Sequence, residues 1–339
     1  MGEPNRVVID LAPEGTRPFP MMLDTGAQGS VLTPRMAREL GVTVRRMKSS
    51  PYRRKTVLGR DLQFHVNTKV SDTGSKTGFE YGLLGGNFLE EYVVEIDFPA
   101  RQVRFLDPKK YRVPEEVTGP DETSFSLNVT ARRPFAEVEV DGAPVQVLVD
   151  TGAPFPIVVA GPVAKKLGVD VAALEPFAEL GFVVGSTEAR FHEAESVRVG
   201  TISQGPLPVL VVPRGSFNLG GATDSLIGYD LFAPFVVRFD YPRKRLWLRR
   251  AAPLDPVFLG VDYRRGQELG VFLVARGEQT EVWRVSPDGT AQRFGLRGGD
   301  RIELDPTAIH AKVSAGEPLT VFRKRADGWT EVMLPEAQP

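Results

Sequence analysis

The tripeptide Asp-Thr-Gly occurs three times in this chain of 339 residues, at positions 24–26, 72–74 and 150–152. Two carboxyl groups held about 3 Å apart share one proton and can activate a water molecule between them. Such a pair needs only two of the three tripeptides. Other chemistries have less support, because the chain has no cysteine and its 3 histidines lie far apart in sequence. These counts exclude thiolate catalysis and argue against a histidine metal site or a Ser-His-Asp triad.

The first and third tripeptides follow similar predicted elements. "NRVVIDL" and "PFPMML" predict two strands, the second of which ends at Asp24. "FAEVEV" and "PVQVLV" alternate with period two, are joined by the turn Asp141-Gly142, and lead into Asp150. A short helix is expected after each, with Thr33 or Gly161 at its start and Gly41 or Gly168 at its end.

A longer repeat indicates that the chain contains a duplicated β-rich unit. "LLGGNFLEEYVVEIDFPARQV" (83–103) aligns without a gap on "LIGYDLFAPFVVRFDYPRKRL" (226–246). Because both segments recur in the same order, we place the two halves at 1–112 and 122–250. Asp72 lies in the polar run "VSDTGSKTGFE" and has no counterpart in the second half. It is therefore interpreted as a turn residue.

Each half resembles the catalytic unit of retropepsin-like aspartic proteases. An apolar strand enters Asp-Thr-Gly-Ala, and an apolar-apolar-Gly element follows later, at Leu83-Leu84-Gly85 and at Leu226-Ile227-Gly228. The resemblance implies a mostly β, bilobal protease domain made of two pseudo-symmetric β-barrel halves. It implies endopeptidase activity on peptide or protein substrates with no metal or cofactor.

The same resemblance assigns roles to individual residues. Asp24 and Asp150 would be the catalytic pair, and Thr25 and Thr151 would hydrogen-bond across to the opposite loop. Glycine after each threonine lets the two loops approach closely. The expected supporting residues are Thr25, Gly26, Ala27, Thr151, Gly152 and Ala153.

Segments that cover the substrate are less clearly marked. "FVVGSTEARFHE" (182–193) predicts a hairpin flap with its tip at Gly185-Ser186. The equivalent span of the first half is basic over 45–55, which fits either a flap that favours acidic peptides or a solvated edge. Pro156 is unusual so close to a catalytic loop.

The last stretch, residues 255–339, resembles a bacterial PDZ domain through "VFLGVD" and "VWRVSPDGTAQRFGLRGGDRIELD". The resemblance implies a small β-barrel with short helices and a closing hairpin around Asp327-Gly328. A C-terminal peptide would add to its free strand edge, with its carboxylate bound near Leu259, Gly260 and Val261. The alternative is a domain that only packs on the protease.

Composition limits the other functions. The formal net charge is -1, which gives no general attraction for nucleic acid, and no apolar run reaches the ~18 residues of a membrane span. The N-terminal residues lack the pattern of a signal peptide. Resemblance alone favours a bacterial envelope or secreted location. The remaining alternative to an enzyme is an inactive peptide-binding or scaffold protein with the same folds.

Overall fold

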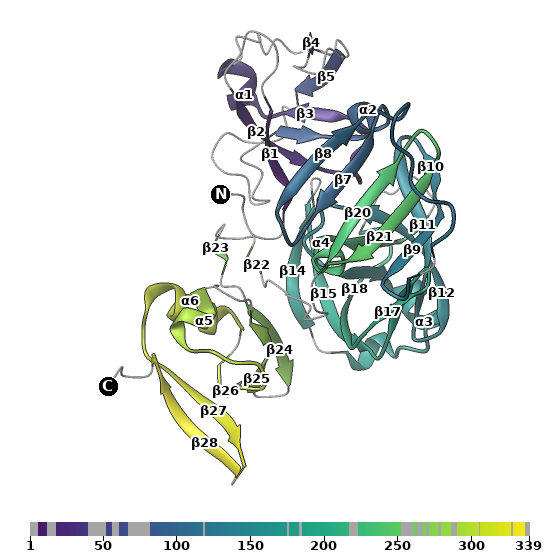
Figure 1. Ribbon diagram of the computed structural model, residues 1–339. Coiled ribbons are helices and arrows are strands. Elements are labelled where there is room, and N and C mark those ends of the chain that lie inside the picture. The colour runs from purple at the N-terminus through teal and green to yellow at the C-terminus, as the bar shows by residue number, and fades with distance from the viewer. Residues whose placement is uncertain are drawn as a thin grey trace.

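The computed structural model is mostly β, as the sequence predicts (Figure 1). Its sheets are open among the residues that the structure describes, so the closed barrels expected for the protease halves and for the C-terminal unit are not found. The described residues are 6–11, 18–39, 52–55, 61–66, 82–117, 119–174, 176–182, 185–216, 223–251, 261–262, 267–268, 271–276, 279–285, 290–304, 306–326 and 328–335.

The first sheet contains the strand that leads into Asp24. Its strands lie in the order β1-β2-β6-β3-β5-β4. The central strand β2 is mostly buried, pairs antiparallel with β1 and runs parallel to β6. The bounds are β1 Val8–Leu11, β2 Phe19–Leu23, β3 Ser30–Leu32, β4 Tyr52–Lys55, β5 Asp61–Val66 and β6 Gly82–Leu84.

The second sheet contains the strand that ends at Asp150. It has the order β14-β15-β18-β13-β19-β12-β11-β16-β17, with β10 paired to β11. The predicted hairpin is confirmed, because β11 and β12 pair antiparallel up to Val140↔Ala143 around Asp141 and Gly142, both at positive φ. The bounds are β10 Asn128–Thr130, β11 Arg133–Val140, β12 Ala143–Asp150, β13 Ile157–Ala160, β14 Pro176–Phe182, β15 Gly185–Ala194, β16 Val197–Val199, β17 Ile202–Gln204, β18 Leu207–Val212 and β19 Ser225–Gly228.

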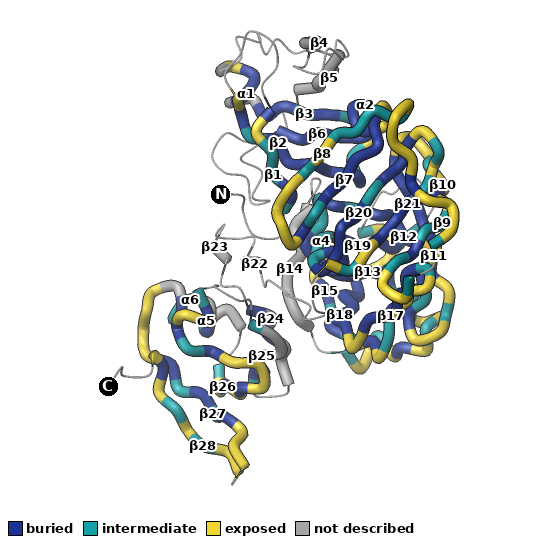
Figure 2. Tube along the Cα trace, viewed as in Figure 1, coloured by how far each residue is buried: buried dark blue, intermediate teal, exposed yellow. Residues whose placement is uncertain are grey.

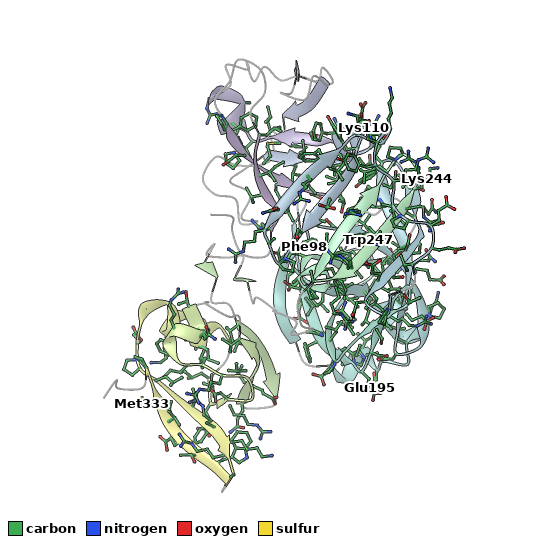
Figure 3. All side chains as sticks on the ribbon, viewed as in Figure 1. Phe98, Lys110, Glu195, Lys244, Trp247 and Met333 are labelled. Carbon is green, nitrogen blue, oxygen red and sulfur yellow. The ribbon has the colours of Figure 1, made fainter. Side chains whose placement is uncertain are left out.

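A third sheet is built from both of the repeated segments. β7 from 83–103 pairs antiparallel with β20 from 226–246, with Ile96 opposite Val237. The order is β8-β7-β20-β21-β9 (Figure 1), and Trp247 lies on it as labelled in Figure 3. Residues from both predicted halves therefore share one continuous sheet. The bounds are β7 Val93–Asp97, β8 Gln102–Leu106, β9 Glu122–Ser126, β20 Phe235–Asp240 and β21 Arg245–Arg250.

Short helices follow the Asp-Thr-Gly loops and the apolar-apolar-Gly elements. Thr33 is the N-cap residue of the first helix, as predicted, since its hydroxyl accepts a hydrogen bond from the Met36 amide. In the third, Ala160 rather than Gly161 is the N-cap residue, and Gly168 ends the turn at positive φ. The bounds are α1 Pro34–Glu39, α2 Gly86–Leu89, α3 Gly161–Lys166, the 3-10 helix Val171–Ala173 and α4 Tyr229–Phe232.

The predicted second-half hairpin is present, but its tip is displaced from the predicted position. Gly185 and Ser186 lie in β15, where they pair with Phe182 and Gly181 of β14. Gly185 and Ser186 therefore belong to the ladder and do not form the tip. In the first half, residues 45–51 lie outside the described residues, and 52–55 form β4.

The C-terminal segment forms a sheet with the order β24-β25-β26-β27-β28 and a separate β22-β23 pair. The closing hairpin is confirmed by the pairing of Arg325 with Gly328. Helix α6 lies over residues that carried no helical prediction. Leu259 and Gly260 lie outside the described residues, and Val261 begins β22. The bounds are β22 Val261–Asp262, β23 Gln267–Glu268, β24 Val271–Arg276, β25 Gln279–Val285, α5 Thr290–Phe294, β26 Arg301–Ile302, α6 Pro306–Ala315, β27 Leu319–Arg325 and β28 Gly328–Leu334.

A continuous hydrophobic core joins the first two sheets and the shared sheet, and the C-terminal sheet and its helices bury a separate one (Figure 2). Two acidic side chains are buried on the shared sheet, Asp240 and Glu95. Glu95 is 5% exposed and binds Arg104 on one side and Arg238 on the other. Arg238 also lies 4.4 Å from the centre of the Trp247 ring. These contacts tie β7 and β8 to β20 and β21.

We expect Arg238→Ala to lower the free energy of unfolding by about 2–4 kcal/mol, because it leaves the buried Glu95 carboxylate with one partner that is mostly in solvent. Arg104→Ala is the matched control. Its side chain is 60% exposed, so its loss should cost less than about 1 kcal/mol. Urea denaturation measures both, and equal losses would contradict the account.

Candidate active site

Asp24 and Asp150 each lie at the end of a buried strand, beside an apolar-apolar-Gly element. The Asp24 amide donates to the Leu84 carbonyl at 3.0 Å. Asp150 ends β12 and lies opposite Gly228 in the parallel β12-β19 pair. Strand pairing on both sides thus holds each carboxyl-bearing residue at a defined point.

The two threonines connect the loops through reciprocal hydrogen bonds. The Thr25 hydroxyl donates to the Val149 carbonyl at 2.6 Å and accepts from the Thr151 amide at 3.0 Å. The Thr151 hydroxyl donates to the Leu23 carbonyl at 2.8 Å and accepts from the Thr25 amide at 3.1 Å. Both threonines are fully buried. The bonding across that the resemblance implied is therefore present in both directions.

The glycines let the loops meet. A Cβ at Gly26 would lie 2.4 Å from the Asp150 carboxyl carbon, and a Cβ at Gly152 would lie 2.7 Å from that of Asp24. Any side chain at either position would collide with the opposite carboxyl group. Tripeptides 126 residues apart in sequence are brought to one place in this way.

Backbone amides contact both carboxylates. The Ala27 amide donates to Asp24 Oδ1 at 2.9 Å, and the Gly152 amide donates to Asp150 Oδ1 at 2.9 Å. The methyl groups of Ala27 and Ala153 offer no hydrogen bond of their own. Amide donors favour the ionised form of each acid.

Burial nevertheless dominates the acidity of the pair. It raises the pKa of Asp24 well above its ordinary value, and the charge of Asp150 and a hydrogen bond between the two side chains raise it further. Burial also raises the pKa of Asp150, while the Gly152 amide and the bond to Asp24 oppose the rise. The two groups titrate as one system in which a single proton is shared.

The apolar-apolar-Gly elements support the two loops in different ways. In the first half, the Gly85 amide donates to the Ser30 hydroxyl at 3.1 Å, and that hydroxyl donates to Asn87 Oδ1 at 2.8 Å. In the second half, the Gly228 amide donates to the Pro156 carbonyl at 3.1 Å. Pro156, six residues after Asp150, thus takes the place that Ser30 has after Asp24. No motif in the sequence singled out Ser30 or Asn87 as supporting residues. An alignment of the two halves could have indicated them.

A model of the aspartyl protease family matches residues 9–77 and 136–231, which include both of these loops. This match supports aspartic protease function for the chain. No curated protein matches the chain.

Three solved structures that show some likeness to the chain differ in their identity, TM-score and coverage. A retropepsin-like aspartic protease from Rickettsia conorii is 24% identical and has a TM-score of 0.32, over 38% of this chain and 90% of that one. EIAV protease, complexed with the inhibitor HBY-793, is 20% identical and has a TM-score of 0.24, over 30% of this chain and 85% of that one. Basic 7S globulin from soybean is 12% identical with a TM-score of 0.38, over 75% and 96%.

Of the other predicted positions, Asp72, Leu259 and Gly260 lie outside the described residues. The described residues contain no cluster of acidic and histidine side chains that could bind a metal. No helix among them has the length and apolar character needed to span a membrane.

Thr25→Ala and Thr151→Ala should each lower the free energy of unfolding by about 1–3 kcal/mol, since each leaves a buried amide and a buried carbonyl without a partner. Thr→Ser at the same positions keeps the hydroxyl and is the control. Denaturant titration compares the four variants with the wild-type protein. Serine variants as unstable as the alanine variants would contradict the role assigned to the hydroxyls.

Asp24→Asn should raise the melting temperature at pH 7. A carboxyl group whose pKa is raised by folding favours the folded state below its unfolded pKa of about 3.9, and that contribution is lost as the pH rises through the folded pKa. Asparagine does not ionise, so the variant avoids the loss. Scanning calorimetry from pH 3 to 8 should show the gain disappearing below about pH 4. A variant that melts lower than wild type at pH 7 would contradict this sign.

Proposed function

We propose that this protein is an aspartic endopeptidase in which Asp24 and Asp150 hydrolyse peptide bonds in an extended substrate. One observation carries the proposal: reciprocal threonine bonds and two glycines hold two carboxyl groups against each other. A structural role does not require this arrangement, because burial and contact with Asp150 raise the pKa of Asp24, which costs stability at neutral pH. The family match supports the same reaction class.

The chemistry follows from the shared proton. The ionised carboxylate takes a proton from a water molecule, whose oxygen attacks the scissile carbonyl carbon. The protonated partner donates to the carbonyl oxygen, which avoids a free oxyanion. The neutral tetrahedral diol then collapses as a proton passes to the leaving nitrogen. The reaction needs no nucleophilic side chain.

Substrate contacts are proposed for two further regions. The β14–β15 hairpin, which includes Gly185 and Ser186, is the flap candidate, supported by its position at one end of the second sheet. The C-terminal unit is proposed as a PDZ-like peptide-binding domain. Its strand β24 lies at a sheet edge and has α6 beside it, so an extended peptide could add to that edge. Leu259, Gly260 and Val261 remain the proposed carboxylate-binding loop.

Asp24→Asn and Asp150→Asn should each lower kcat/KM by at least about 10³-fold on a mixed peptide library, because neither variant can share a proton as the wild type does. Mass spectrometry of the products measures this and separates internal from terminal cleavage. Asp72→Asn makes the same change in the third tripeptide and should cleave like wild type.

A statine-type inhibitor should stop the wild-type reaction and raise its melting temperature. Cleavage by both asparagine variants at the wild-type rate would exclude the proposed pair. A folded wild-type protein that neither cleaves nor binds the inhibitor would favour the inactive peptide-binding alternative.

A further inference from the structure

A buried arginine faces one member of the carboxyl pair. In the antiparallel β11-β12 ladder, Phe135 lies opposite Leu148. Continuing this register by two residues places Arg133, the first residue of β11, opposite Asp150, the last residue of β12. Residues directly opposite in such a ladder point to the same face, with Cβ atoms about 5 Å apart. Arg133 is 6% exposed, so little water separates its charge from the aspartate.

Local structure fixes this arginine in place. Ala131 and Arg132, both at positive φ, form the tight turn between β10 and β11, and Thr130 pairs with Arg133 across it. The guanidinium lies 5.7 Å from the centre of the Phe135 ring. Burial lowers the pKa of Arg133 and the charge of Asp150 opposes that shift. A guanidinium stays protonated in proteins, so Arg133 is a permanent cation within electrostatic reach of this carboxyl group.

The charges around Asp24 are arranged differently. Continuing the β1-β2 register places Arg6 opposite Asp24, but Arg6 is only half-buried and lines a hollow with Asp97 and Arg101. Solvent and a neighbouring carboxylate weaken its effect. Among the described residues, Tyr241 also responds to the charges of the pair. Burial and the charges of Asp24, Asp150 and Glu90 raise the pKa of Tyr241, and Glu90 pairs with Arg132 at 3.0 Å.

We infer that Arg133 is a positioning residue for the shared proton: its cation holds Asp150 in the ionised form and leaves the proton on Asp24, an assignment that rests on the proposed peptidase function. The two-fold likeness of the loops is therefore broken by a residue outside the tripeptides.

The assignment gives each carboxyl group one role in the first step. Asp150 removes a proton from water as the water oxygen bonds to the carbonyl carbon. The carbonyl π pair forms the new O–H bond with the proton that Asp24 releases. The product is a neutral diol, with Asp150 protonated and Asp24 ionised, so protons and charges balance.

The test replaces Arg133 with glutamine, and Arg132→Gln is the matched control. Arg132 is the adjacent residue, carries the same charge, and has a side chain that is 52% exposed. Loss of a close cation raises carboxyl pKa values, so both limbs of the kcat/KM pH profile should move to higher pH by roughly one unit in Arg133→Gln. Arg132→Gln should shift it by less than about 0.3 units. Arg133→Lys, which keeps the charge, should restore most of the wild-type profile.

A second readout does not require turnover. Carbon-13 labelling of the aspartate carboxyl groups, assigned with Asp24→Asn and Asp150→Asn, follows each group through a pH titration. Asp150 should ionise before Asp24 in the wild-type protein, and the midpoints should rise in Arg133→Gln. The reverse order, unchanged midpoints in a folded Arg133→Gln variant, or an equal shift in Arg132→Gln would overturn the inference. A wild-type protein that ionises in the expected order but cleaves nothing would instead count against the proposed function.

Discussion

The arrangement of this molecule depends on four hydrogen bonds between two threonines and the backbone of the opposite loop. Thr25 and Thr151 each donate to a carbonyl at the end of the other half's strand and accept the other's amide. Glycine as the next residue lets each loop approach the opposite carboxyl group, because a Cβ there would collide with it. The resulting desolvation and charge repulsion are unfavourable for folding at neutral pH, and the surrounding buried sheets must offset them.

The shared sheet supplies much of that support. β7 and β20 come from equivalent places in the repeat and pair with each other, so each predicted half completes the other. The core that runs under both loops is continuous. Consequently neither loop can shift without disturbing packing on both sides, which keeps the carboxyl groups within the narrow range that proton sharing requires.

Equivalent positions in the repeat are not chemically equal. The Gly85 amide is satisfied by a serine hydroxyl backed by Asn87, whereas the Gly228 amide uses the carbonyl of Pro156. The arginine opposite Asp150 is buried, and the one opposite Asp24 is half-exposed. A single chain allows such differences, because each half can change separately while the backbone geometry of the tripeptides is retained.

Sequence patterns alone predicted the strands that lead into Asp24 and Asp150, the Asp141-Gly142 turn and the Thr33 cap. These are local patterns whose meaning depends on residues within one hairpin or one helix turn. The sequence misplaced the flap tip, because the pairing of Gly185 with Phe182 and of Ser186 with Gly181 sets a register that the local pattern does not specify. Three features emerge only in the folded molecule: β7 pairs with β20, Ser30 and Asn87 support one loop, and the strand register puts Arg133 opposite Asp150. Those contacts join residues far apart along the chain, and burial, which gives a charge its strength, is a property of the packed molecule alone.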